Sequence, residues 1–395
     1  MKKLNYPSLY VYALAFLIPF SYFINLNWDA SSIVNSHQNK NAYFGADVAR
    51  VVDNLEDSKE SSHYRDRMHP YFSIVAVSVS KLGVYFGYKN LAFPIYKLIF
   101  GTFGVFLFWL FIYANTNICQ AFASLALLFT SMSFRVWSAI PETFLFSFFT
   151  LMLALNLMRL KHKPEFILFS TLAGTVTNIM LGLIHLVLDQ QNKKAIVKII
   201  LGFSFMAVIA ALVQQSIYPT STYFFDVLGY QEELDYIIKD LSSTQFRLFD
   251  FLMSGFILPL TNDISLPITT AHLWQQFFSV EFLASKRMML FTILTMATIA
   301  ATYLLALYGF FKNKQKNKIS QSILFFLGFE LVLHLFYGDD PFLYSLNFTP
   351  LIIIFMSLHQ PEKIKAASPY LFVFLALLIQ RFNFLDPSIF AKYFF

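Results

Sequence analysis

Two acidic residues near the starts of apolar segments are the best candidates for chemistry in this chain of 395 residues. Asp47 belongs to a short amphipathic stretch, and Glu142 follows Pro141 at the start of an apolar run. Two carboxylates beside one polar cavity could take the proton of a hydroxyl or amine acceptor, which is the task of a general base. The alternatives are that Asp47 simply faces water and that Glu142 only complements the dipole of its helix.

Several basic residues stand near the same segments and could bind a phosphate group. They are Arg65, Arg67, His69, Lys286 and Arg287. The first three precede Pro70, which can be the first residue of a helix, and a helix N-terminus attracts anions. Lys and Arg bind phosphate by charge and by bidentate hydrogen bonds respectively. Anchoring among lipid headgroups explains these residues equally well.

Three polar residues within apolar sequence could line a cavity inside a membrane. Asn178 lies in the middle of the run from 165 to 189, and Glu330 lies in the run from 319 to 337, with His334 one turn further on. An ionisable side chain at membrane depth is costly unless it is paired or hydrated. We therefore expect Glu330 and His334 to face a polar cavity.

The composition excludes an ordinary water-soluble globule. Charged residues make up 13% of the chain, about half the usual share of roughly 25%, and 57% of the residues are hydrophobic. The single cysteine, Cys119, provides neither an intramolecular disulfide nor a cysteine-based metal site. The net charge of +6 is spread between apolar segments, which indicates basic loops at the inner leaflet and no nucleic-acid binding. No motif for nucleotide or serine-hydrolase chemistry is present.

The apolar runs predict one multi-pass membrane domain that covers residues 1–395. They lie at 9–24, 70–88, 91–113, 118–133, 137–159, 165–189, 195–217, 288–311, 319–337, 342–358 and 369–385. The positive-inside rule places the N-terminus in the cytoplasm and makes residues 27–68 a first external loop, which holds 12 charged residues and a surface-lying amphipathic helix. The basic turn from Lys312 to Lys318 fixes the later orientation, and residues 218–287 form a second external region with an aromatic face.

The apolar runs cannot all be simple membrane crossings, and two of them are exceptions. If every run from 70 to 159 crossed, the basic turn from Arg159 to Lys163 would lie outside, so one run between His69 and Asn115 is re-entrant or too short. Thr175, Thr177 and Asn178 divide the run from 165 to 189 into halves of about 18 Å, against a hydrocarbon core of about 30 Å. This predicts a hairpin of two half-helices beside a polar cavity.

The order of these features resembles the integral-membrane glycosyltransferases of the GT-C fold, which include protein mannosyltransferases and lipid A aminoarabinose transferases. The resemblance covers roughly residues 1–210. Three motifs carry it: an acid in the amphipathic helix of the first loop (Tyr43-Phe-Gly-Ala-Asp47-Val-Ala-Arg50), a His69-Pro70 helix start, and the Pro141-Glu142-Thr-Phe helix start.

The resemblance implies an all-α, GT-C-like helical bundle with two external amphipathic regions and re-entrant or broken helices. It implies transfer of a sugar from a polyprenyl-phosphate or diphosphate donor to an acceptor glycan, lipid or protein on the external face, in a bacterial inner membrane. Asp47 would be the base, Glu142 a supporting acid, and the five basic residues would lie near the donor phosphate. Val48 follows Asp47 where many members have a second acid, so no cofactor is implied with certainty and a divalent metal stays open.

Two other classes of function remain open. Broken helices and a buried Glu330 also occur in transporters and flippases, although the sequence lacks two matching inverted halves. A non-catalytic subunit of an envelope-assembly complex could retain the same fold. Loss of transfer activity on removal of the Asp47 carboxylate separates the enzyme from the other two.

Overall fold

A computed structural model of the protein describes residues 9–25, 48–56, 63, 66–85, 91–190, 192–226, 229–231, 237, 251, 256, 286–313, 317–337 and 344–383. Throughout these residues the regular structure is helical, apart from one isolated bridge between Ile237 and Tyr337. The all-α prediction is therefore confirmed for the described part of the chain. Asp47, Arg65 and the predicted aromatic face of the second external region lie outside it.

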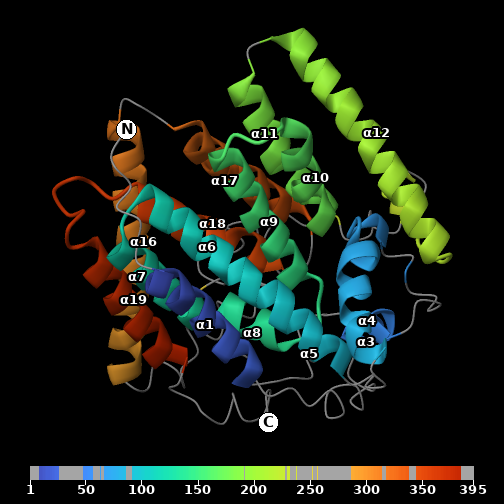
Figure 1. The fold of residues 1–395 in the computed structure, drawn as a ribbon. Coiled ribbons are helices and arrows are strands. Elements are labelled where there is room, and N and C mark those ends of the chain that lie inside the picture. Colours follow the sequence, from blue (N-terminus) through green and yellow to red (C-terminus); the bar gives the residue numbers. More distant parts are fainter. Residues whose placement is uncertain are drawn as a thin grey trace.

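The helices follow the predicted apolar runs closely, and Figure 1 shows how they pack. The longer ones are α1 (Leu9–Asn25), α3 (Val48–Glu56), α4 (Ser78–Tyr85), α6 (Thr102–Asn115), α7 (Ile118–Thr130), α8 (Met132–Ala139), α9 (Phe144–Arg159), α10 (Pro164–Gly174), α11 (Ile179–Asp189), α12 (Lys193–Ile217), α16 (Lys286–Lys312), α17 (Lys318–Phe336), α18 (Ser345–Leu358) and α19 (Ser368–Asn383). The shorter ones are η2 (Phe72–Val77), α5 (Ala92–Tyr96), η4 (Lys97–Gly101) and η5 (Val176–Asn178).

Within the described residues, four helices are long and apolar enough to cross a membrane. They are Ala92–Asn115, Lys193–Ile217, Ile293–Lys312 and Lys318–Phe336. The pair α7 and α8 passes the same test together, but it bends by 63°. A helix of 20 residues spans about 30 Å, which is the thickness of the hydrocarbon core. The protein is therefore a helical membrane protein by length and composition.

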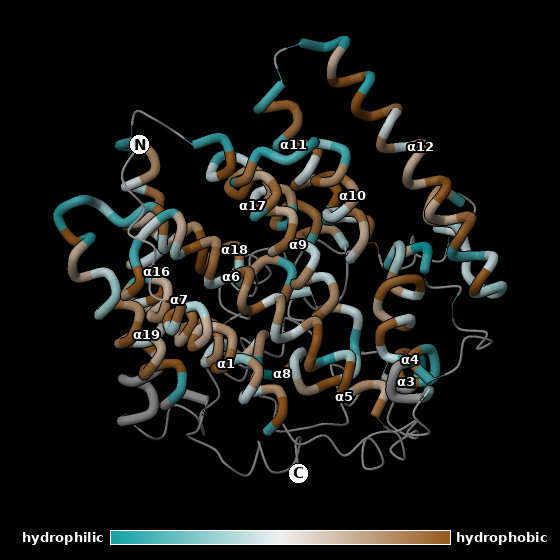
Figure 2. Tube along the Cα trace, viewed as in Figure 1, coloured by the Kyte–Doolittle hydropathy of each residue, from teal (hydrophilic) through white to brown (hydrophobic). Residues whose placement is uncertain are grey.

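The helix α12 stands at the edge of the bundle and is apolar along most of its length (Figure 2). Its buried residues form one stripe of Phe203, Ala207, Ala211 and Gln214. Large apolar side chains such as Leu201 and Phe205 are mostly exposed elsewhere on this helix. An apolar helix that is open on most sides fits contact with lipid, so α12 is positioned between the protein core and the bilayer.

The helix α18 lies at the centre of the bundle. It is buried from Ser345 to Ser357 without interruption, and it packs against α6, α7, α8, α9, α16 and α17. An apolar helix in a membrane protein can face lipid or protein, and the burial of every residue from Ser345 to Ser357 shows that protein surrounds this one. The core of the fold is therefore α18 with α6 and α9.

Basic turns gather at one end of the bundle, which we call the basic end. The α9 C-terminus, the α10 N-terminus and the α11 C-terminus meet the α17 N-terminus there, and Lys318 lies 3.0 Å from the carboxylate of Asp189. Figure 2 shows hydrophilic residues where α11 ends and where α12 begins. Lys318 therefore lies at the same end as the basic turn of residues 159–163, which is the arrangement that the predicted orientation requires.

The predicted break in the run from 165 to 189 is present. The helix α10 ends at Gly174, η5 forms a single turn, and α11 begins at Ile179. The two halves fold back on each other, because the backbone of Gly182 in α11 faces Thr171 and Leu168 in α10. A Cβ at Gly182 would lie only 2.6 Å from Thr171 Oγ1, so this close approach requires glycine. The hairpin of two half-helices is confirmed.

The register against α12 shows which run near His69 does not cross. Tyr71 donates to the carbonyl of Ala207 at 2.8 Å, and Ser78 is 3.1 Å from the hydroxyl of Tyr218, beyond the α12 C-terminus. The chain from 71 to 78 therefore runs parallel to α12 and away from the basic end. The helix α4 then packs against α5, and the continuous span Ala92–Asn115 returns to the basic end. The segment that does not cross is therefore in the predicted run of residues 70–88, of which the structure describes residues 70–85.

Tyr71 marks the point where this segment reverses direction. Its φ is 66°, a left-handed conformation that costs a residue with a side chain about 1–2 kcal/mol. Stacking of its ring on Phe169, with centroids 4.6 Å apart, and its hydrogen bond to α12 offset that cost. The turn after His69 is therefore held from two sides.

The described helix of the first loop is buried on more than its apolar face. Asn54 is buried in the structure, as are Val51 and Leu55. The helix α3 packs against η2, α4 and α5. It therefore has protein on more of its circumference than a helix that only lies on a membrane surface.

We predict that Gly174→Ala destabilises the protein by about 1–3 kcal/mol, as overpacking typically does. A Cβ at this position would lie 2.6 Å from the backbone Cα of Ser147 and 2.6 Å from Thr150 Oγ1. The matched control is Gly328→Ala in α17, where nothing lies within 4 Å and the helix should gain up to about 1 kcal/mol. Thermal unfolding of the purified protein in detergent measures both. Equal effects of the two substitutions would contradict the packing of the hairpin tip on α9.

Candidate functional site

The two interrupted segments meet at residues 68 and 69. The carbonyl of Met68 accepts hydrogen bonds from the amide of Val176 at 3.0 Å and from Thr175 Oγ1 at 3.1 Å, and both donors belong to the tip of the α10–α11 hairpin. His69 Nδ1 lies 3.1 Å from the carbonyl of Gly174. A carbonyl only accepts, so this ring nitrogen carries a hydrogen and donates. Irregular backbone from both segments is thus satisfied inside protein.

The other ring nitrogen of His69 faces the start of α9. Its Nε2 is 3.3 Å from Thr143 Oγ1, and Glu142 Oε2 accepts from the amide of Thr143 at 2.8 Å. We call His69, Thr143, Glu142 and the Gly174 carbonyl the His69 centre. Glu142 is buried, with 4% of its surface exposed. The structure therefore brings the predicted residues His69 and Glu142 together.

The sequence suggested that Glu142 lies in the first turn of its helix, but the structure places it before the helix. The helix α9 begins at Phe144, with Thr143 as its N-cap residue, so Glu142 precedes it by two positions. The main-chain carbonyl of Glu142 accepts from the Tyr96 hydroxyl at 2.9 Å, which fixes the approach to the helix. The carboxylate consequently lies beside His69 instead of along the helix surface.

The Thr143 hydroxyl lies between the Glu142 carboxylate and the His69 imidazole. Its oxygen is 3.3 Å from His69 Nε2 and 3.4 Å from Glu142 Oε2, but a hydroxyl has only one hydrogen to donate. It can donate to a neutral imidazole, or it can donate to the Glu142 carboxylate and accept from a protonated imidazole. The His69 centre can therefore pass a proton between an imidazole and a carboxylate through one hydroxyl.

Asn178 extends the polar contacts one helical turn further along α9. Its Nδ2 donates to Ser147 Oγ at 2.7 Å, and Ser147 donates to Asn347 Oδ1 at 2.7 Å. The Oδ1 atom of Asn178 is buried without a hydrogen-bond partner among the described residues. A buried acceptor of this kind costs about 1–3 kcal/mol, so it offers a strong position for a ligand hydroxyl. Asn178 itself is fully buried, and its predicted place beside a polar cavity stays a prediction.

Asp66 is a buried carboxylate that the sequence analysis missed. It accepts from Ser73 at 2.9 Å, from Ser221 at 2.7 Å and from Gln214 at 3.2 Å. We call these residues and His63 the Asp66 network. Burial raises the pKa of Asp66 to about 7, although the hydrogen bonds from Ser221 and Ser73 and the charge of Arg50 partly offset the rise. A carboxyl group poised near neutral pH is suited to proton transfer.

His63 belongs to the same network but does not form a nucleophilic triad with it. Its Nδ1 is 2.7 Å from Ser73 Oγ, and Ser73 donates its hydrogen to Asp66. While Asp66 is ionised, His63 must therefore donate to the hydroxyl and cannot take its proton. Activation of a serine nucleophile requires the reverse direction. The hydrogen-bonded chain of His63, Ser73 and Asp66 is instead suited to relaying a proton.

Arg67 joins the two predicted external regions. Its guanidinium donates to the carbonyl of Gly229, and its own carbonyl accepts from Tyr230 at 2.8 Å. It is 7% exposed and so is not a surface cation. Asp47 and Arg65 lie outside the described residues, while Lys286 and Arg287 begin α16. Phosphate binding by this group of basic residues stays a prediction.

Glu330 and His334 pair with each other inside α17, and the polar cavity that the sequence predicts for them stays a prediction. Their closest atoms are 3.2 Å apart, one turn apart on the helix, and both side chains are buried. The imidazole of His334 stacks on Tyr344, with centroids 4.7 Å apart, and Glu330 Oε1 has no hydrogen-bond partner among the described residues. Pairing lowers the cost of an ionisable residue at membrane depth.

Among the residues that the structure describes, no three His, Cys, Asp or Glu side chains gather as metal ligands would. Divalent metals such as magnesium require several oxygen ligands around one point. The described side chains thus do not form a metal site by themselves, and the possible metal stays a prediction.

No family model, curated protein or solved structure matches this chain. The geometry of the His69 centre and of the Asp66 network is therefore the basis for any functional conclusion.

We predict that ionisation of Asp66 makes the protein less stable as the pH rises. Its pKa is about 7 in the folded protein and about 3.9 in an unfolded chain, so the folded state holds the extra proton between these values. Raising the pH through this window should lower the free energy of unfolding by up to about 4 kcal/mol. Unfolding temperatures measured from pH 5 to 8 should fall for the wild type and stay flatter for Asp66→Asn.

The control for this measurement is Glu362→Gln, because Glu362 is exposed and pairs with the exposed Lys365 at 3.1 Å. Its pH profile should follow that of the wild type. Parallel profiles for Asp66→Asn and the wild type would show that Asp66 does not titrate in this range.

Proposed function

We propose that the protein transfers a sugar from a polyprenyl-phosphate or diphosphate donor to an acceptor at the end of the bundle opposite the basic end. The observation that carries the proposal is the pair of buried carboxylates, Glu142 and Asp66, on either side of the His69–Pro70 turn. The 16 residues of α9 separate Glu142 from Arg159 at the basic end by about 24 Å. Glu142 is therefore far from the basic end, which supports a site near the opposite face of the membrane.

The proposed reaction needs a base and a cation. The acceptor hydroxyl loses its proton to a carboxylate, its oxygen bonds to the anomeric carbon, and the bond from that carbon to the phosphate oxygen breaks. The phosphate leaves with the electron pair, which a cation stabilises. Asp47 is the base that the sequence resemblance implies, and Glu142 supports it through the relay with Thr143 and His69. The five predicted basic residues are the candidates for the phosphate.

The lipid-facing helix beside the Asp66 network supports a lipid-linked donor. Gln214, which contacts Asp66, belongs to the buried stripe of α12, and the other faces of α12 are open and apolar. A polyprenyl tail could lie in lipid along α12 while its phosphate reaches the interface. An enzyme for such a donor needs a polar site at the edge of the membrane, and these elements supply one.

The orientation in this proposal follows from charge. The basic end contains Arg159, Lys161, Lys163 and Lys318, so the positive-inside rule assigns it to the cytoplasm. The His69 centre then faces outward, where a lipid-linked sugar would be used. A bacterial inner membrane with a cytoplasmic N-terminus is the matching location, and the acceptor would be a glycan, a lipid or a protein.

A transporter or flippase is the second candidate, and the observation that favours it is the buried pair Glu330 and His334. Ionisable pairs at membrane depth and a broken hairpin are features of secondary carriers. A silent subunit that retains the fold is the third possibility. Substrate uptake or lipid translocation in liposomes tests the second candidate directly.

We predict that membranes expressing the protein transfer radiolabelled sugar from total polyprenyl-linked donors to an endogenous acceptor. Glu142→Gln and Asp47→Asn should each lower the rate at least about a hundredfold, which is typical for loss of a general base or its support. Asp66→Asn should change the pH dependence of the rate. Glu362→Gln, an exposed acid, should match the wild type.

The amount of protein in the membrane is measured in parallel, so that a folding defect is not read as lost activity. Equal labelled product with the wild type, with both acid variants and without the protein would rule out these acids as the catalytic groups for the donors supplied. The liposome measurement would then decide between a carrier and a silent subunit.

A further inference from the structure

The basic end holds a cavity of about 690 Å³ that the proposed transfer reaction does not use. Its walls are the α9 C-terminus with the following turn, the first turn of α10, the last turns of α11 and the start of α17. Asn115, at the end of α6, closes one side. A cavity of this size matches sites for small molecules or lipid headgroups.

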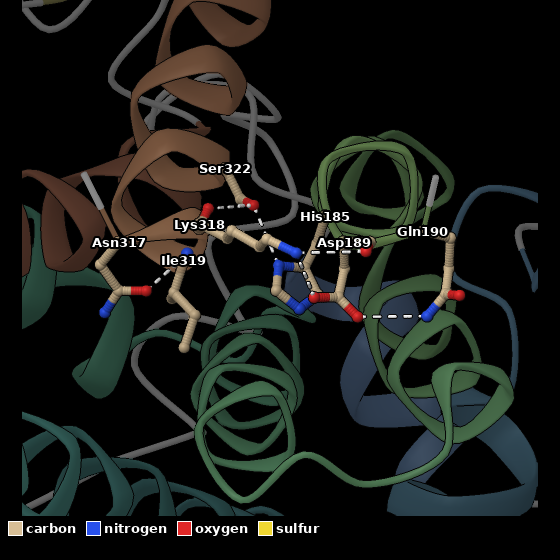
Figure 3. Close-up of polar contacts among 7 residues, drawn as sticks. All are labelled: His185, Asp189, Gln190, Asn317, Lys318, Ile319 and Ser322. Carbon is tan, nitrogen blue, oxygen red and sulfur yellow. Dashed lines mark hydrogen bonds and ion pairs between the residues drawn. The ribbon is translucent and has the colours of Figure 1, made fainter. Parts of the chain in front are cut away.

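The lining is strongly cationic. Among the described lining residues, Arg159, Lys161, Lys163 and Lys318 are balanced by one carboxylate, that of Asp189. Its oxygens are already engaged, since Oδ1 pairs with Lys318 at 3.0 Å and Oδ2 accepts from Gln190 at 3.2 Å (Figure 3). It therefore leaves the charges of the other cations uncompensated.

Arg159 has donors available. Its Nε is buried without a hydrogen-bond partner among the described residues, and one terminal nitrogen lies 3.4 Å from Asn156 Oδ1, which is a long contact. Arg159 as a whole is half-buried, and a buried guanidinium N–H without a partner carries a desolvation cost. A bidentate phosphate would satisfy it, because the planar fork of arginine matches two phosphate oxygens.

Lys161 stands at a position where glycine is favoured. It has a φ of 55° and ends α9 in a Schellman turn, in which its amide donates to Met158 at 3.1 Å and the amide of His162 donates to Leu157 at 3.0 Å. A lysine there costs about 1 kcal/mol relative to glycine. The chain keeps an ammonium group at the rim of the cavity in spite of this cost.

His185 completes the lining on α11. Ser322 donates its single hydrogen to the carbonyl of Lys318 at 2.8 Å, so His185 Nδ1, 3.1 Å from Ser322 Oγ, must donate to the hydroxyl (Figure 3). This contact fixes the ring and ties α11 to α17, as the pair of Asp189 and Lys318 also does. The positive dipole ends of α10 and α17 at this cavity are offset by the negative ends of α9 and α11, so the net positive charge comes from the basic side chains.

We propose that this cavity binds a phosphate group, either a monoester or a diphosphate. The phosphate could belong to a lipid headgroup or to a soluble molecule, and the recognition by Arg159, Lys161 and Lys318 is the same in both cases. Basic pockets between membrane helices on the cytoplasmic side are typical sites for anionic headgroups. Apolar lining residues such as Ile167 and Leu186 suit the first carbons of an acyl chain. This site is separate from the proposed transfer site at the other end.

The test uses the purified full chain in uncharged detergent and in phosphatidylcholine nanodiscs. Inorganic diphosphate is titrated calorimetrically in the first arm, and dioleoyl phosphatidic acid is added to the nanodiscs in the second. Arg159→Gln should weaken binding about tenfold, as loss of a charge-assisted hydrogen bond does. Lys161→Gly should weaken it several-fold without lowering the unfolding temperature, because glycine relieves the left-handed backbone.

The matched control is Lys363→Gln, which removes an exposed charge from a turn that does not line the cavity. Its affinity should equal that of the wild type. Saturable binding of diphosphate alone would identify a soluble ligand, and binding of phosphatidic acid alone would identify a lipid. Either result supports the site if Arg159→Gln and Lys161→Gly weaken the binding. Binding of neither probe, or binding that Arg159→Gln and Lys161→Gly leave unchanged, overturns the proposal. The readout is independent of sugar transfer.

Discussion

The carbonyl of Met68 is the point on which the architecture of the candidate site depends. Backbone groups at membrane depth must find partners within the protein, and the hairpin tip has no regular helix to provide them. Val176 and Thr175 donate to this carbonyl, and His69 donates to Gly174 in return. Each interrupted segment thus provides hydrogen-bond partners for backbone groups of the other. Because of this exchange, the His69 side chain is fixed in one tautomer, and its second nitrogen must face Thr143 and the acid beside it.

The two ends of the bundle have opposite chemistry. At one end the carboxylates of Glu142 and Asp66 are buried among hydroxyl, amide and imidazole groups, and the raised pKa of Asp66 follows from that burial. At the other end Arg159 and Lys161 line a cavity in which Asp189 is already engaged. The first end is suited to moving protons, and the second is suited to holding an anion. The continuous spans between them keep these environments apart.

The sequence predicts what depends on local pattern. The hairpin was predictable because Thr175, Thr177 and Asn178 interrupt an apolar run, and the pairing of Glu330 with His334 follows from helical spacing. Asp66 was not predictable, because it stands between Arg65 and Arg67 and resembles an exposed loop residue. Its burial depends on Gln214 and Ser221, which lie about 150 residues away in the chain. The same holds for the re-entrant run, since only its register against α12 distinguishes it from a crossing helix.

The direction of the hydrogen bonds ties the protonation of Asp66 to the tautomer of His63. When Asp66 is ionised, Ser73 donates to it and His63 donates to Ser73 through Nδ1. A proton on the oxygen that faces Ser73 would reverse both bonds, because the carboxyl group would then donate to the hydroxyl and the hydroxyl would donate to the imidazole. The imidazole would have to carry its hydrogen on Nε2 instead. Protonation of Asp66 therefore moves the imidazole hydrogen of His63 from Nδ1 to Nε2 without any movement of the backbone. This change occurs at a pH near 7, where the carboxyl group titrates.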